Sequence, residues 1–234
     1  NKENFIISNL RNYILDKDID ILDKDCLMSK RNELFDKVFC NFPLNEKFMD
    51  VYSEYSSLDH EIFAEVNRNI SSDWIYTLNA LDHMEEGGKT LVIMTNSGLS
   101  NSSDYQLRDY LLRKKKVEAV ISLPENLLSM ANMDINLVLL SESNEDIKMV
   151  DASSIYTKGR RLNRLTEEDV ENIIFNYNNE TSLSMNIPIE DLDEQKILLP
   201  KYYLDKKLVE YDLRFEDIIV DIRRGSPLKS SEID

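Results

Sequence analysis

Residues 35–44 read Phe-Asp-Lys-Val-Phe-Cys-Asn-Phe-Pro-Leu, an apolar run with β propensity that stops at an Asn-aromatic-Pro corner. A strand that ends this way carries the amide of Asn41 to a turn stiffened by Pro43. Open α/β sheets bind their ligands at the carboxyl ends of their strands. Residues 41–44 are therefore the first candidate for a functional site, although an ordinary Asx-type turn would use the same residues.

Segments with alternating strand and helix character surround this run. Apolar spacing predicts helices over residues 3–15, within 61–84, and over 104–115 and 166–177, the last with Thr166 as its N-cap. Apolar runs predict strands at residues 19–22, 35–40, 90–94, 117–123, 135–140 and 147–151. This order is typical of the α/β class and predicts a mainly parallel, doubly wound sheet with helices on both faces.

A polar break follows the last of these helices. Residues 178–182 read Asn-Asn-Glu-Thr-Ser, and the alternation of strands and helices is absent from the sequence beyond them. We therefore expect one domain over residues 1–178 and a C-terminal extension over residues 179–234.

The chain is strongly acidic, with 28 basic and 44 acidic side chains among 234 residues and a net charge of −16. Such a charge repels DNA unless the cations are clustered. One cluster, residues 113–116, is explained by the favourable interaction of cations with the end of a helix. A second lies in a Gly-containing loop, where Arg160, Arg161 and Arg164 are candidates for contact with DNA phosphate or with a protein partner.

Composition excludes several classes of protein. No apolar run approaches the roughly 20 residues that cross a bilayer, and the first residues do not form a signal peptide, so we expect a cytoplasmic location. Cys26 and Cys40 are not in a metal-ligand spacing and are expected to be free reduced thiols. With only His60 and His83 besides, a metal centre is not expected.

Further segments match, in order, the landmarks of one protein family. They are residues 20–27 (Asp-Ile-Leu-Asp-Lys-Asp-Cys-Leu), 87–89 (Gly-Gly-Lys), 96–98 (Asn-Ser-Gly), 119–127 (Ala-Val-Ile-Ser-Leu-Pro-Glu-Asn-Leu) and 150–153 (Val-Asp-Ala-Ser). Together with the run at 35–44, they make residues 5–177 resemble the later part of the catalytic domain of the N6-adenine DNA methylase family. These proteins are the modification subunits of type I restriction-modification systems. The segment after Leu213 is similar to the opening of the DNA-specificity modules that accompany them.

The resemblance implies a fold, an activity and partners. The fold would be a Rossmann-like sheet of an S-adenosylmethionine-dependent methyltransferase, incomplete at its amino end. The activity would be methyl transfer from S-adenosylmethionine to a flipped adenine in DNA. The implied partners are DNA, a specificity subunit and, as a further partner, a restriction subunit, with neither a metal nor a membrane involved.

The same resemblance implies roles for individual residues. The Asn41 side chain and the Phe42-Pro43 backbone would accept hydrogen bonds from the amino group of the target adenine. Leu44 stands where the family has an aromatic ring that contacts the flipped base, so the ring of Phe42 is the alternative stacking surface. Asp25 would accept from the adenine amino group of the cofactor, while Cys26 and Leu27 line its ring.

One family landmark does not occur in this sequence. The Gly-rich loop that lets backbone approach the methionine part of the cofactor is expected to precede residue 1, which leaves the cofactor site incomplete. We therefore expect the isolated chain to bind cofactor poorly and to be inactive. A second hypothesis is a non-catalytic assembly or DNA-positioning module that binds a specificity subunit. Leu44, the missing Gly-rich loop and the acidic charge favour it, and the intact Asn41 and Pro43 disfavour it.

Overall fold

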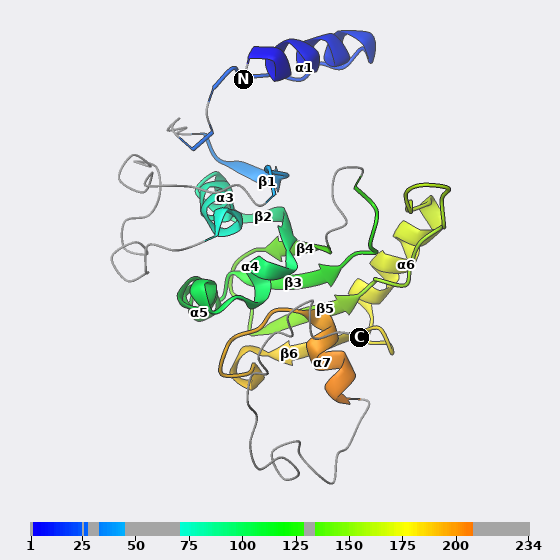
Figure 1. The fold of residues 1–234 in the computed structure, drawn as a ribbon. Coiled ribbons are helices and arrows are strands. Elements are labelled where there is room, and N and C mark those ends of the chain that lie inside the picture. Colours follow the sequence, from blue (N-terminus) through cyan, green and yellow to red (C-terminus); the bar gives the residue numbers. More distant parts are fainter. Residues whose placement is uncertain (1, 25, 28–32, 45–70, 129–133, 208–234) are drawn as a thin grey trace, which may run out of the picture.

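The fold was analysed in a computed structural model that describes residues 2–24, 26–27, 33–44, 71–128 and 134–207. Its centre is a sheet of six strands in the order β1-β2-β4-β3-β5-β6 (Figure 1). The strands are β1 (Phe35–Cys40), β2 (Met84–Thr95), β3 (Val117–Ser122), β4 (Ile135–Leu140), β5 (Asp146–Asp151) and β6 (Ser184–Pro188). The predicted α/β class is therefore confirmed.

The sheet is mixed rather than simply parallel. β1 pairs with β2 and β3 pairs with β5 in parallel, whereas β4 lies antiparallel between β2 and β3, and β6 is antiparallel to β5. Four strands thus run in one direction, and the carboxyl ends of β1, β2, β3 and β5 meet at one edge. This carboxyl edge is where an open α/β sheet holds its ligands.

Helices cover both faces of the sheet, as the sequence predicts. The helices are α1 (Lys2–Ile14), α3 (Ser72–Leu81), α4 (Asn96–Ser100), α5 (Tyr105–Arg113), α6 (Glu167–Asn178) and α7 (Pro200–Lys207), with 3-10 turns at Ser102–Asp104 and Ile189–Asp191. One core cluster joins the buried side chains of α3, α5 and α7 to the sheet. A smaller cluster, which includes Ile173 of α6, packs on Ile121 and Val150. None of these helices is both long enough and apolar enough to cross a membrane, within the described ranges.

Local sequence signals explain the boundaries of α6. The Thr166 side chain accepts from the backbone N–H of Asp169, and the Asp169 carboxylate accepts from the backbone N–H of Thr166 at 2.8 Å. This reciprocal capping box satisfies donors that the first turn of a helix leaves open. The hydrogen bonds that the Asp169 carboxylate accepts from the backbone N–H and the hydroxyl of Thr166 hold its pKa below its usual range.

Two predictions about the elements need correction. Residues 19–22 form no strand. Strand β2 begins at Met84 rather than at residue 90, because Gly87 takes a φ of 76° that lets the chain bend within the strand. The predicted helix over residues 3–15 is present as α1, but it has no buried residue in the described part of the chain, and most of its apolar side chains are exposed.

The polar break at residues 178–182 is a tight turn within the fold. The Ser184 hydroxyl donates to the carbonyl of Asn179 at 2.7 Å, and the strand that follows, β6, extends the sheet along β5. Helix α7 then packs on the sheet with Tyr203 and Leu204 buried. Residues 184–207 therefore belong to the same folding unit as the sheet, and the boundary predicted at 178 falls inside it. The segment that resembles a specificity module lies outside the described residues.

Candidate active site

The corner that follows β1 borders one end of a cavity of about 580 Å³, which runs along β1 and α3 from Phe35 and His83 to Pro43. Asn41 and Pro43 line this cavity with their side chains exposed, while Phe42 between them is buried. No hydrogen bond to the Asn41 amide is found in the part of the chain that the structure describes. The amide is therefore held on the backbone of the corner with its oxygen and nitrogen available to a ligand.

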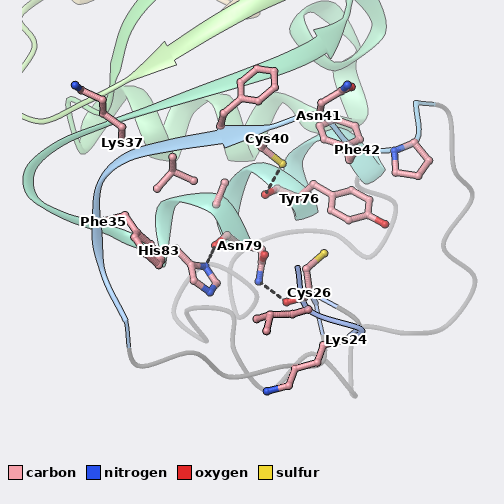
Figure 2. A pocket seen from close by; sticks show the side chains of 15 residues that line it. Lys24, Cys26, Phe35, Lys37, Cys40, Asn41, Phe42, Tyr76, Asn79 and His83 are labelled. Atoms are coloured by element: carbon pink, nitrogen blue, oxygen red, sulfur yellow. Dashed lines mark hydrogen bonds between the residues drawn. The ribbon is translucent and has the colours of Figure 1, made fainter. Parts of the chain in front are cut away.

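The ring of Phe42 fixes this corner to helix α3. It stacks on Tyr76 with 4.8 Å between ring centroids and 8° between planes (Figure 2). The Cys40 thiol adds a weak hydrogen bond to the Tyr76 carbonyl, with 3.9 Å between sulfur and oxygen. Because Phe42 is only 6% exposed, its ring is part of the core and does not offer the stacking surface that the sequence suggests.

Helix α3 is in turn attached to the end of β2. The Asp73 carboxylate accepts from the backbone N–H and the hydroxyl of Thr95, at 3.0 and 2.7 Å. The Trp74 indole N–H donates to the carbonyl of Gly98 at 2.8 Å. These buried contacts fix α3, and through Tyr76 they fix the corner that carries Asn41.

The predicted cofactor residues are only partly brought to the cavity. Cys26 lines it, and its backbone carbonyl accepts from the Asn79 side-chain amide at 3.2 Å (Figure 2). Leu27 is buried at 3% exposure and belongs to the core cluster, so it does not line the cavity. Asp25 lies outside the described residues. The sequence gives no signal for Tyr76 and Asn79, because both come from a helix that is distant along the chain.

Burial also changes the chemistry of Cys40. Desolvation, with a smaller contribution from the charge of Cys26, raises the pKa of the Cys40 thiol to about 11. This thiol is therefore protonated at neutral pH and acts as an apolar wall of the cavity. Leu44, the last residue of the corner, is half-buried and packs against the main core.

A chain of amide and hydroxyl groups crosses the carboxyl edge beside the corner. The Ser122 hydroxyl donates to the Asn136 side-chain oxygen at 2.7 Å, and the Asn136 amide donates to the Asn96 oxygen at 2.8 Å. The Asn96 amide then donates to the Asp134 carboxylate at 2.9 Å. Asn136 is fully buried, so these bonds satisfy polar groups that would otherwise destabilise the sheet.

The three predicted cation residues do not line the cavity. Arg160, Arg161 and Arg164 are exposed on the loop that follows β5, which also leaves the sheet at the carboxyl edge. The structure thus places the corner and the arginines on the same edge but at different strands.

Comparison with known proteins places this geometry in a family. The sequence profile of the N-6 DNA Methylase family matches residues 2–208. The chain belongs to this family. The family resemblance carried by the sequence motifs is thereby confirmed.

Two individual relatives agree with the family match. The type I restriction enzyme MpnII methylase subunit of Mycoplasma pneumoniae is 26% identical over 182 residues, covering 70% of this chain and 33% of the relative. The type I restriction-modification system methyltransferase subunit from Streptococcus thermophilus shares the fold with a TM-score of 0.75 at 18% identity, covering 86% of this chain and 46% of that subunit. The chain therefore spans about a third of the curated relative and less than half of the solved one.

Proposed function

We propose that this chain forms part of an enzyme that transfers a methyl group from S-adenosylmethionine to the N6 amino group of adenine in DNA, within a type I restriction-modification system. The observation that carries the proposal is the exposed Asn41 amide at the carboxyl end of β1, held beside a cavity by the buried ring of Phe42. Family membership supports it. A protein that acts on chromosomal DNA would work in the cytoplasm.

The corner suits this reaction chemically. The lone pair of an adenine amino group is delocalised into the ring, so the nitrogen becomes a better nucleophile when its hydrogens are bound by acceptors. The Asn41 side-chain oxygen and the Phe42 carbonyl are two such acceptors, and Pro43 contributes no competing N–H. Fixed acceptors at the reacting nitrogen stabilise the charge that develops there without rearranging during the reaction.

The target adenine has to leave the duplex to reach this corner. Extruding a base costs a few kcal/mol, which contacts in the enzyme pocket offset. The cavity walls include the side chains of Phe39, Tyr76 and Pro43, which provide apolar surface for this purpose. Its volume lies within the ~300–1,000 Å³ range of small-molecule sites.

The cofactor would supply an electrophilic methyl group on a sulfonium. Cys26 and Asn79 lie on the side of the cavity away from the corner, where apolar surface beside a polar backbone suits the adenine end of S-adenosylmethionine. Asp25, next to Cys26 in sequence, remains the proposed acceptor for its amino group. No glycine of the described ranges lines the cavity, so we assign no residue to the methionine end.

The partners follow from the same proposal. A type I modification subunit receives its DNA target from a specificity subunit, and we propose that this chain assembles with one and, in the complete system, with a restriction subunit. The segment after Leu213 remains the proposed link to the specificity subunit.

The test removes the side-chain acceptor. The test uses host cells that have no other adenine methyltransferase and that express the protein as its gene encodes it, together with its partner subunits. In these cells Asn41→Ala should lower genomic N6-methyladenine by about 100- to 1,000-fold relative to wild type. Asn186→Ala is the matched control, because Asn186 is an exposed asparagine on β6 and does not line this cavity.

Two outcomes would contradict the proposal. Methylation that persists in the Asn41→Ala variant removes Asn41 from the mechanism. A wild-type complex that assembles on its specificity subunit yet forms no N6-methyladenine supports the non-catalytic assembly module instead.

A further inference from the structure

The loop after β5 is a rigid carrier of positive charge. Thr157 and Arg164 pair through two backbone hydrogen bonds of 3.0 and 3.1 Å, which close residues 157–164 into a small hairpin, here called the basic loop. A Cβ on Gly159 would lie 1.9 Å from the Leu162 carbonyl oxygen, so only glycine fits this turn. Four cations of the basic loop are exposed: Lys158, Arg160, Arg161 and Arg164.

The basic loop is fixed to the carboxyl edge of the sheet. The backbone N–H of Asn163 donates to the carbonyl of Asn126, and its side-chain amide donates to the carbonyl of Glu125, both at 2.9 Å. Residues 125–126 follow β3, whose carboxyl end lies at the same edge as that of β1 (Figure 1). The Thr157 hydroxyl also donates to Asp169 of the α6 capping box at 3.1 Å. The cations are thus held on the edge that carries Asn41.

The separation between Asn41, which follows β1, and the basic loop, which follows β5, matches the scale of a DNA duplex. β1 and β5 are four positions apart in the sheet, and a spacing of about 4.8 Å between strands gives roughly 19 Å. Successive base pairs rise by about 3.4 Å, so this span corresponds to about six base pairs. DNA with its adenine at Asn41 would therefore bring flanking phosphates close to the basic loop.

The other basic cluster has a different environment. At residues 113–116, Arg113 pairs with Asp109 at 2.9 Å, Lys116 pairs with Glu142 at 2.6 Å, and Lys115 pairs with Glu145. These residues precede β3 and lie at the opposite edge of the sheet. Acidic partners thus neutralise this cluster.

In contrast, the four cations of the basic loop form no ion pair with any described residue. The nearest carboxylates in sequence, Glu167 and Glu168, occupy the first turn of α6, where the helix dipole stabilises them. On a chain with a net charge of −16, charge that is left unneutralised in this way indicates an anionic ligand.

We propose that the basic loop binds the phosphate backbone of DNA beside the target adenine. This inference rests on the proposed function, because it is the position of Asn41 that brings the duplex to this edge. Arginine pairs well with phosphate, and contacts of this kind set the register of the duplex without reading its sequence. Without them the acidic chain would repel the DNA that it is to modify.

The salt dependence of DNA binding tests this assignment. The protein as its gene encodes it, assembled with its partner subunits, is titrated with a fluorescently labelled duplex of mixed sequence at several salt concentrations. Each phosphate contact contributes about 0.9 to the slope of log affinity against log salt, so changing Arg160, Arg161 and Arg164 together to Gln should reduce the slope by about two to three. The triple change to Lys should preserve it.

The matched control changes Lys114, Lys115 and Lys116 to Gln, which removes the same charge from the opposite edge and should leave the slope unchanged. Equal slopes for wild type and the arginine variant would overturn the assignment, as would loss of a partner subunit from the arginine variant, which would make the loop a protein contact. Genomic N6-methyladenine is measured in parallel. Its absence from wild type with the slope change present would refute the proposed function and leave the basic loop as a DNA contact.

Discussion

At the scale of single residues, the position of Asn41 depends on one aromatic pair. Phe42 turns inward onto Tyr76, and the neighbouring Asn41 amide is left exposed at the end of β1, beside the cavity. The asparagine corner is predictable from sequence because strand, amide and proline are contiguous. The stack is not, because the helix that supplies Tyr76 is far along the chain, with 36 residues separating Cys40 from Tyr76.

Loss of the Tyr76 ring should slow methyl transfer. An aromatic pair is worth about 0.5–1.5 kcal/mol, so Tyr76→Leu is expected to lower kcat by about 2- to 10-fold with little change in KM, while Tyr76→Phe keeps the ring and stays near wild type. Steady-state kinetics on the assembled enzyme measure both. Tyr202→Leu is the control, because Tyr202 is a similarly half-buried tyrosine in an edge-to-face pair with Tyr203. A Tyr76→Leu enzyme with wild-type kcat would show that the stack does not position Asn41.

The Cys40 thiol should react slowly with alkylating reagents. Its pKa is raised from 9.0 to about 11, chiefly by burial, so at pH 8 the folded protein has about 100-fold less thiolate than the unfolded chain. The rate should rise about tenfold per pH unit up to that pKa. Mass spectrometry of iodoacetamide labelling in a Cys26→Ser background measures this, and equal rates in the folded and urea-unfolded states would contradict it.

At the scale of elements, strands with strong apolar runs are the best predicted. The bounds of β1 and β4 match those expected from sequence, because each ends in apolar residues with strand propensity that are followed by a polar residue. β6 is missed, since Ser-Met-Asn-Ile-Pro is short, contains proline and pairs on one side only with β5. Residues 19–22 show the converse: this apolar run forms no strand, and none of the strands that the structure describes pairs with it.

Arg108 of α5 connects this helix to two other segments of the chain. Its guanidinium is fully buried and donates to the carbonyls of Gly98, Asn101, Gln195 and Lys196 at 2.8–3.2 Å. Desolvation lowers its pKa, although the nearby Asp104 and Asp193 favour the charged form. These hydrogen bonds join helix α5 to helix α4 with its C-cap Asn101 and to the segment before α7.

Arg108→Leu should therefore destabilise the fold strongly. Four carbonyls, that of Gly98 buried and the others partly buried, would lose their donor, which we expect to cost at least about 3 kcal/mol in the free energy of unfolding. Arg113→Leu, which removes an exposed pair within the same helix, should cost less than about 0.5 kcal/mol. Urea denaturation of both variants provides the comparison. Similar midpoints for the two would show that the buried network adds little.

At the scale of the whole molecule, the folding unit built around the sheet extends to residue 207, because β6 joins the sheet and α7 packs on it. The sequence favours an earlier boundary because its polar break resembles a linker, and only the tertiary pairing of β6 with β5 shows that it is a turn. The predicted boundary lies too early because a polar stretch such as residues 178–182 has the same composition in a surface turn as in a linker between domains.

Truncation should distinguish a domain boundary at residue 178 from one at residue 207. A chain of residues 1–178 loses β6 and α7, which exposes the edge of β5 and the surfaces covered by Leu198 and Tyr203. A chain of residues 1–207 keeps every contact described here. We expect the longer form to unfold cooperatively on heating and the shorter form to aggregate, as followed by circular dichroism and size-exclusion chromatography. A cooperatively folded 1–178 would restore the earlier boundary.

The position of β4 has a consequence for how this protein is made on the ribosome. β4 separates β2 from β3 in the sheet, yet it is synthesised after both of them. A nascent chain that has not yet released residue 140 cannot join its two earlier strands, and the edges that β2 and β3 present to β4 stay unpaired until then. Translation pauses before that point would prolong contact with chaperones, whereas pauses after it would not.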